Sequence, residues 1–222
     1  ELLLKNSIIS AVSANLPSIE ELFNARVHFG HKSGLRHPDA TNFLFGTRPI
    51  DGQKDIGRNF DIIDLDITRK YLRRALEFVS YIIAKQGSAL FITLDRQTCN
   101  IVEKAAKECS EFAHCRHFLS GTFTNRHKFF NEFSKMPDVC IFFNTRGNRL
   151  FPHPAIAESS KLLIPSIAIL DSDCKMKHIT YGIPGNDDSP SSVKLFADTF
   201  KNVILQTKEV IVKMPEAKNE NQ

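Results

Sequence analysis

The sequence has 222 residues, of which 42% are hydrophobic and 24% charged, with a formal net charge of +4. This suits one globular domain, or one with short extensions, that is large enough to bury a core. No apolar run approaches the roughly 20 residues that a membrane-spanning helix needs, so the composition excludes such a helix.

The first part of the chain is predicted to hold one short helix and one long irregular segment. Residues 1–17 are an N-terminal extension. Ser18 begins the stretch "SIEELFNARV", and Glu21 follows three residues later, which is a capping box ahead of an amphipathic helix. Residues 28–60 are rich in Gly, His, Pro and Asp. This segment is too long for an ordinary connection, so we expect it to be functional or ordered by a partner.

Regular periodicity begins at "FDIIDL", which predicts a short strand. A helix follows over 67–86, with Gly87 as its C-terminal cap. "SALFITL" is a continuous apolar strand of the kind covered on both faces. "QTCNIVEKAAKECSEFA" predicts a helix with Ile101, Ala105, Cys109 and Phe112 facing inward.

The alternation continues to the end of the chain. "DVCIFFN" and "PSIAILD" are predicted strands on either side of the helix "HPAIAESSKLL". Ser189 and Pro190 open a long helix, and 206–222 form its end and a polar tail. Strands that alternate with helices indicate an α/β fold, a doubly wound parallel sheet with helices on both faces.

The metal-ligating residue types do not form a convincing metal site. The five cysteines are scattered without a CxxC pair, which favours small buried residues of a reducing compartment over zinc ligands. His28, His31 and His37 have zinc-compatible chemistry, but a structural or backbone-contacting role is favoured for them. Asp187 and Asp188 can share a proton or hold a metal, although a turn before a helix N-terminus is the favoured interpretation.

Catalytic motifs are missing. There is no GxxxxGK[ST] or GxSxG, and no glycine-rich turn follows "SALFITL". "SGTFTN" is the main candidate for a phosphate contact, because Gly121 allows close backbone approach and exposed N–H groups at a helix start attract phosphate. No acid, base or nucleophile accompanies this loop, which indicates binding rather than turnover.

Seven motifs then follow one another in the order found in the ribosomal protein S-two family of the small subunit. They are "VHFGH", "FLFGTR", "DIIDL", "SGTFTN", "PDV", "IPSIAILDSDC" and "YGIPGNDD". The chain resembles this family from about Ser18 to Leu205. The resemblance implies a flavodoxin-like domain, no enzymatic activity and no cofactor. It also implies binding to small-subunit ribosomal RNA and to neighbouring ribosomal proteins.

The departures from the family pattern indicate a mitochondrial member. Bacterial members carry a coiled-coil insertion where only eleven residues separate Asn125 from Pro137 here, so we expect that insertion to be missing. The usual double glycine is Ser120-Gly121. Diverged motifs and a start without Met fit a ribosome-bound protein of the mitochondrial matrix, associated with no membrane and not a homo-oligomer.

Three sets of residues are predicted to contact RNA, each against the alternative of plain solvation or protein contact. The first long loop supplies Arg26, His28, His31, Lys32, Arg36 and Arg48. The region of "SGTFTN" supplies Arg116, Thr122, Thr124, Asn125, Arg126 and Lys128. One helix face supplies Arg69, Lys70, Arg73 and Arg74.

Two other functions stay open at this point. A flavodoxin-like enzyme or small-molecule binder would use the ends of its strands, with Asp95, Asp171 and Asp173 as polar groups. A purely protein-binding member would dock through the loops at 37–60 and 144–152, which lack dense cations.

Overall fold

The centre of the molecule is a five-stranded parallel sheet. The computed structural model describes residues 2–49, 59–129, 135–148 and 151–219. The strand order is β10-β9-β6-β4-β5, and every neighbouring pair is parallel. The strands are β4 (Ala89–Ile92), β5 (Phe112–His114), β6 (Val139–Phe142), β9 (Ser166–Leu170) and β10 (Tyr181–Pro184). In chain order this is the 2-1-3-4-5 arrangement of flavodoxin-like folds, which confirms the predicted fold class.

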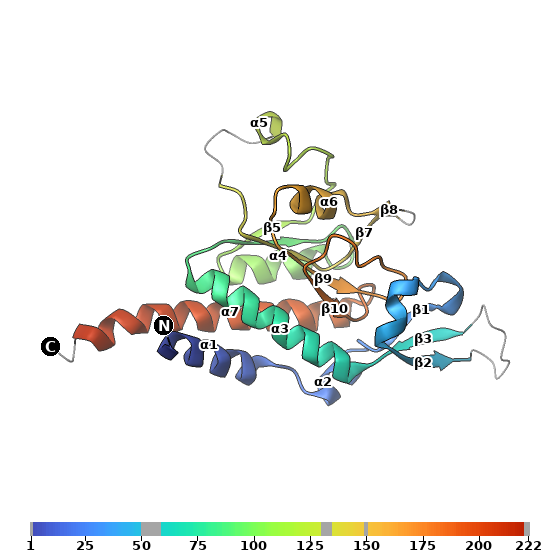
Figure 1. The fold of residues 1–222 in the computed structure, drawn as a ribbon, viewed down its shortest axis with the longest axis horizontal. Coiled ribbons are helices and arrows are strands. Elements are labelled where there is room, and N and C mark those ends of the chain that lie inside the picture. Colours follow the sequence, from blue (N-terminus) through green and yellow to red (C-terminus); the bar gives the residue numbers. More distant parts are fainter. Residues whose placement is uncertain (1, 50–58, 130–134, 149–150, 220–222) are drawn as a thin grey trace.

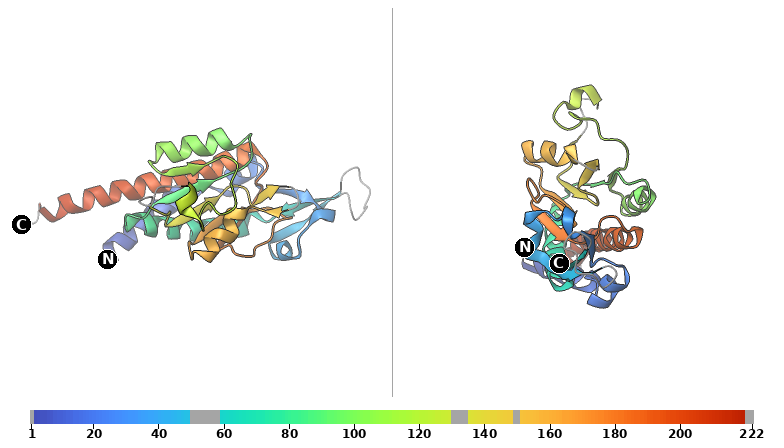
Figure 2. Two further views of the ribbon diagram at one scale, coloured as in Figure 1. Left: turned by 90° about the horizontal axis from the view of Figure 1, so that it is seen from above. Right: turned by 90° about the vertical axis from the view of Figure 1, so that its right-hand side faces the viewer.

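Helices cover both faces of this sheet (Figures 1 and 2). One face packs against α3 (Leu65–Ala84), α4 (Cys99–Glu108) and α7 (Pro190–Asn219), and α1 (Leu2–Asn15) lies on α3 and α7. The opposite face is covered by α6 (Pro154–Lys161) and by Phe118 and Phe123 of the segment that follows β5. None of the described helices combines the length and the apolarity needed to cross a membrane.

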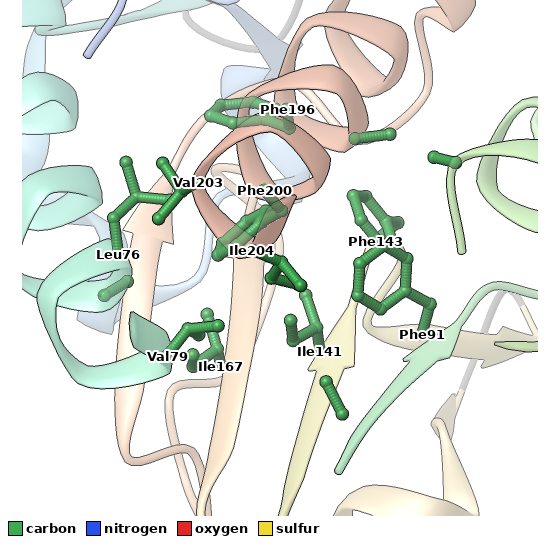
Figure 3. Close-up of a cluster of buried hydrophobic side chains, with 14 of the residues drawn as sticks. Leu76, Val79, Phe91, Ile141, Phe143, Ile167, Phe196, Phe200, Val203 and Ile204 are labelled. Carbon is green, nitrogen blue, oxygen red and sulfur yellow. The ribbon is translucent and has the colours of Figure 1, made fainter. Parts of the chain in front are cut away.

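Alternation along the central strands divides the core between the two faces. Phe91 and Ile141 lie in the cluster beneath α7, where Ile141 lies beside Ile204 and Phe91 packs against Phe143 (Figure 3). Phe142, the next residue along β6, belongs to the opposite cluster. Because both faces are covered, all four residues of β6 and all five of β9 are buried, as their unbroken apolar sequences predict.

The segment expected to be irregular, 28–60, contains two strands in its described part. β1 (Phe29–Lys32) and β2 (Leu44–Arg48) flank β3 (Phe60–Ile63) in an antiparallel sheet that projects from one end of the molecule (Figure 1). Two short 3-10 helices, Ser33–Leu35 and Pro38–Phe43, connect β1 to β2. The "FDIIDL" strand therefore belongs to this small sheet rather than to the parallel one.

A second difference concerns the end of α4. The helix stops at Glu108, and Ser110 adopts a positive φ of 56°, so the chain turns back toward the sheet. Phe112, expected on the inner face of a helix, instead starts the edge strand β5 and is 65% exposed. The helical spacing continued through Phe112 by chance, and the turn at Ser110 was not predicted.

The remaining elements are short. α2 (Ile19–Asn24) has the predicted capping box, in which the Glu21 N–H donates to Ser18 Oγ over 3.2 Å and the Ser18 N–H donates to Glu21 Oε2 over 2.9 Å. β7 (Arg146–Asn148) and β8 (Phe151–Pro152) form a hairpin after β6, and α5 (Arg126–Phe129) is a single turn. α7 begins at Pro190, as predicted.

The C-terminal end of α3 differs from the prediction that Gly87 is its cap. Gln86 takes the left-handed conformation with φ 61°, and the Gly87 N–H donates to Ile82 O over 3.0 Å. This is a Schellman motif with glutamine at the position usually taken by glycine. Gly87 is needed for a different reason, because a Cβ there would lie 2.5 Å from Ile82 Cγ2 and 2.9 Å from Ile82 O.

Gly87→Ala is therefore expected to lower the free energy of unfolding by about 1–3 kcal/mol, the usual cost of overpacking. Gly46→Ala is the matched control, since a Cβ at Gly46 meets nothing within 4 Å. The control should be neutral or slightly stabilising, because alanine restricts the unfolded chain. Urea titration of both variants checks this contrast, and equal midpoints for the two would contradict it.

Candidate nucleic-acid interface

His31 lies at the junction between the small sheet and the parallel sheet. β1 is anchored to the loop after β9 by a hydrogen bond from the His31 N–H to Ser172 Oγ, over 2.9 Å. The His31 ring then faces three carboxylates. Nδ1 is 2.9 Å from Asp171 Oδ2, and Nε2 is 3.3 Å from Asp173 Oδ2 and 3.2 Å from Asp188 Oδ2. His31 is therefore turned into the protein.

These carboxylates change the ionisation of the site. The hydrogen bond to Asp171 and the surrounding negative charge raise the pKa of His31 to about 9, against the opposing effect of burial. Burial raises the pKa of Asp171, and it raises that of the fully buried Asp187 well above its usual range. A protonated His31 thus supplies the positive charge that this acidic cluster requires at neutral pH.

The same residues have the chemistry of metal ligands. Among the described residues, one atom each of His31, Asp171 and Asp188 lies within 4.8 Å of the others. In the present arrangement the His31 ring forms an ion pair with each of the two carboxylates. Asp188 contacts His31, and Asn186 Oδ1 accepts the N–H groups of Asp188 and Ser189, which forms the predicted turn before α7.

The raised pKa of His31 predicts that stability falls at alkaline pH. Because the folded-state pKa lies above the unfolded value of 6.5, this contribution is complete below about pH 6.5 and is lost as the pH rises through about 9. The loss amounts to about 3 kcal/mol. The raised pKa values of Asp171 and Asp187 act in the same direction.

Thermal midpoints measured from pH 6 to 9.5 in a chelating buffer check this expectation. His31→Gln should flatten the decline. His37→Gln is the control, since His37 Nδ1 accepts the Asp39 N–H over 3.2 Å and lies 3.4 Å from one carboxylate, that of the half-exposed Asp39, among the described residues. A decline of the same size in His31→Gln and in the parent protein would contradict the assignment to His31.

Two arginines are also held by buried acids. Arg36 forms a two-point ion pair with Asp61, with Nε 2.8 Å from Asp61 Oδ2 and with Nη2 on Oδ1. Arg146 Nη2 is 2.7 Å from Asp173 Oδ2. His31 and Arg36, both predicted to contact RNA, thus have their charges neutralised inside the protein. Their place in the structure supports a role in joining the two sheets.

The pairing also bears on the small-molecule alternative. Asp171 pairs with His31, and Asp173 pairs with Arg146. Asp95 Oδ1 accepts the Gln97 N–H over 3.2 Å at the start of α4. In the described part of the chain, these three acids do not converge on one cavity as that alternative requires.

The other members of the first set lie nearer to solvent. Lys32 and Arg48 are exposed on β1 and β2, and Arg26 is exposed in a left-handed turn with φ 63°. The His28 ring stacks on Phe23, with centroids 4.4 Å apart, and burial lowers its pKa. His28 is therefore a packing residue, whereas the three exposed cations remain available for a partner.

The "SGTFTN" loop uses its backbone N–H groups for an internal carboxylate. Glu158 of α6 is buried and accepts the N–H of Gly121 over 2.5 Å, of Phe123 over 2.9 Å and of Thr124 over 3.4 Å. The expectation that these donors attract phosphate is therefore wrong, because Glu158 occupies the anion position. Gly121 is required by its φ of 93°.

Some side chains of this region are buried and bonded internally, and others are exposed. Thr122 is buried, and its hydroxyl donates to Leu119 O over 2.5 Å. Thr124, Asn125, Lys128 and Arg116 are exposed. Arg126 starts α5, and its side chain lies outside the described features.

The third set lies on the exposed face of α3. Arg69 Nε donates to Pro17 O over 3.2 Å, and Arg73 Nε is 3.0 Å from Glu77 Oε1. The Arg74 guanidinium lies 5.8 Å from the centre of the Tyr71 ring, and Lys70 is exposed. All four remain at the surface, so the predicted basic face forms as expected.

Three important residues were missing from the sequence prediction. Asp61 and Glu158 are buried acids on otherwise apolar faces, and Arg146 follows a buried strand. The sequence feature that could have identified the two acids is their core-facing position in an otherwise apolar pattern. A buried acid at such a position requires a partner. The pattern does not say which cation or N–H group that partner is.

The fold and the surface together define an α/β protein with a flavodoxin-like parallel sheet. His31 and Arg36 are paired with acids where the small sheet meets the parallel sheet, and other cations are exposed. The sequence profile of the family described as Ribosomal protein S2 matches residues 22–139 and 128–207. The chain therefore belongs to the ribosomal protein S2 family.

Curated relatives agree with this assignment. "Small ribosomal subunit protein uS2m" of Bos taurus is 38% identical over 192 residues, covering 86% of this chain and 62% of the relative. "Small ribosomal subunit protein uS2" of Agrobacterium fabrum is 28% identical, with 82% of each chain covered. The protein of the same name from Bradyrhizobium sp. ORS 278 is 30% identical, with 82% of this chain and 64% of the relative covered. The chain thus spans less than two thirds of the bovine and Bradyrhizobium proteins.

The comparisons also bear on the missing insertion. The alignment with the Agrobacterium protein has 223 positions, one more than this whole chain, although only 82% of the chain is aligned. The bacterial relative therefore has residues that this chain lacks. The family profile matches in two parts that meet at 128–139, where the insertion was expected to be missing.

Proposed function

We propose that this protein is a structural component of the small subunit of the mitochondrial ribosome. In this role it binds ribosomal RNA and neighbouring ribosomal proteins to support translation, without catalysing a reaction. The family assignment and the similarity to the mitochondrial bovine protein support the proposal. The proposal includes a location on ribosomes of the mitochondrial matrix.

The observation that carries RNA binding is the division of the cations into two classes. His31 and Arg36 are neutralised by internal carboxylates. Lys32, Arg48 and Lys70 are exposed and have no acidic partner among the described residues. Exposed cations without an internal partner are suited to the positioning contacts that proteins make with phosphate and sugar.

Protein neighbours are supported by exposed apolar side chains near the small sheet. Phe45 of β2 is 79% exposed, and Leu35, just after β1, is 57% exposed. Aromatic side chains such as Phe45 are enriched at protein interfaces, and Leu35 adds exposed apolar area near the same sheet.

Crosslink mapping on purified mitochondrial small subunits tests the proposal. Ultraviolet crosslinking followed by mass spectrometry should attach RNA to peptides that contain Lys70 or Arg116. It should attach none to the paired Arg36. Crosslinks to proteins alone would favour the protein-binding alternative instead.

A further inference from the structure

A cavity of about 510 Å³ opens at the carboxyl ends of β4 and β5, beside the first turns of α4. Arg96 comes from the loop after β4, and Arg116 and His117 come from the segment after β5. Asn100 and Glu103 contribute from α4. Two loops that leave adjacent parallel strands therefore bring two arginines and a histidine to the same opening.

The charge of this cavity is not balanced from within the protein. In the described part of the chain, neither Arg96 nor Arg116 has an ion pair or a side-chain hydrogen bond. Glu103 is the one acid in the lining, and it lies 3.7 Å from Lys107 Nζ. Arg36 and Arg146, in contrast, are held by buried aspartates.

The donor set fits the oxygens of a phosphate group. A guanidinium presents a planar fork of N–H donors that binds phosphate at two points, and an amide or imidazole adds single donors. The cavity also lies beyond the carboxyl ends of parallel strands, the edge at which open α/β sheets bind ligands, one strand away from the switch point between β4 and β6.

We propose that this cavity binds a phosphate ester between Arg96 and Arg116, supplied by the backbone of ribosomal RNA in the assembled subunit. The inference rests on the proposed function and adds Arg96, Asn100 and His117 to the predicted RNA contacts. It also moves the phosphate position from the "SGTFTN" loop, where Glu158 occupies the donors, to the segment that precedes it.

A salt titration of RNA binding tests the proposal. The full chain is titrated with a transcript of small-subunit ribosomal RNA at several potassium chloride concentrations. The measured quantity is the salt slope, the magnitude of the slope of log binding constant against log salt concentration. Each lost phosphate contact lowers the salt slope by about 0.7–0.9. Arg96→Gln combined with Arg116→Gln should therefore lower it by roughly 1.5. Lys104→Gln is the control on the same helix, since Lys104 Nζ lies 3.9 Å from Glu108 Oε1 on the exposed side. A salt slope unchanged in the double variant, at an unchanged thermal midpoint, overturns the proposal.

A second arm identifies the source of the phosphate. Inorganic pyrophosphate and ATP are titrated into the same proteins by calorimetry. Weak binding of pyrophosphate that disappears in the double variant is expected. Tight binding of ATP with an unchanged RNA salt slope overturns the RNA source and indicates a free nucleotide.

Sedimentation of the double variant separates this test from the proposed function. If the variant sediments with the small subunit while its slope stays unchanged, only the cavity assignment fails.

Discussion

Replacing Arg36 with methionine is expected to lower the free energy of unfolding by about 3 kcal/mol, the largest effect of any single substitution considered for this chain. Asp61 is fully buried, and Arg36 holds both of its carboxylate oxygens. Methionine keeps much of the length of the side chain but leaves the carboxylate without a counter-charge inside the protein. β1 and β3 should separate first, because this ion pair ties the turn after β1 to β3.

Denaturant titration of three variants checks this expectation. Arg48→Met, on the neighbouring strand β2, removes an exposed cation and should change the free energy of unfolding by no more than about 0.5 kcal/mol. Asp61→Asn combined with Arg36→Met removes both charges and should recover part of the loss. If Arg36→Met and Arg48→Met cost the same, the ion pair does not stabilise the fold.

Glu158→Gln should have the second largest effect, a loss of about 2 kcal/mol in the free energy of unfolding. The carboxylate accepts three backbone N–H groups from the "SGTFTN" loop. An amide offers one oxygen and turns an NH₂ group toward donors, so at least one buried N–H loses its acceptor. The loop should detach from α6, and the packing of Phe123 should loosen with it.

Hydrogen exchange followed by mass spectrometry distinguishes this local effect from global loss of structure. Peptides that cover 119–125 should lose protection in Glu158→Gln while those of β6 keep theirs. Glu77→Gln, an acid of α3 that pairs with Arg73 away from this loop, is the control and should leave both unchanged. Full protection of the loop in Glu158→Gln would mean that the carboxylate is not its main support.

The order of elements and the fold class were predictable from the sequence for a clear physical reason. The buried strands β4, β6 and β9 have unbroken apolar sequences, and α3 has apolar residues at helical spacing. These patterns are local, and burial on both faces dictates them. Edge strands carry a weaker signal. β5 was therefore assigned to the end of a helix, and β1 and β2 were missed within an irregular segment.

The candidate site was less predictable, because pairing depends on contacts between distant parts of the chain. His31 meets Asp171, 140 positions away, and Gly121 meets Glu158, 37 positions away. The sequence identifies the His31 side chain and the backbone N–H groups around Gly121 as candidates for phosphate contact. Only the folded arrangement shows that an internal acid already satisfies each of them. The exposed basic face of α3 was predicted correctly because it depends on helical spacing alone.

Gradient sedimentation of a mitochondrial lysate, with the chain followed by immunoblotting, tests the ribosomal assignment most directly. The gradients are run at two magnesium concentrations. The chain should migrate with the small subunit and should shift with it when low magnesium unfolds the particle. Migration at the position of a free 25.1 kDa protein under both conditions would contradict the account.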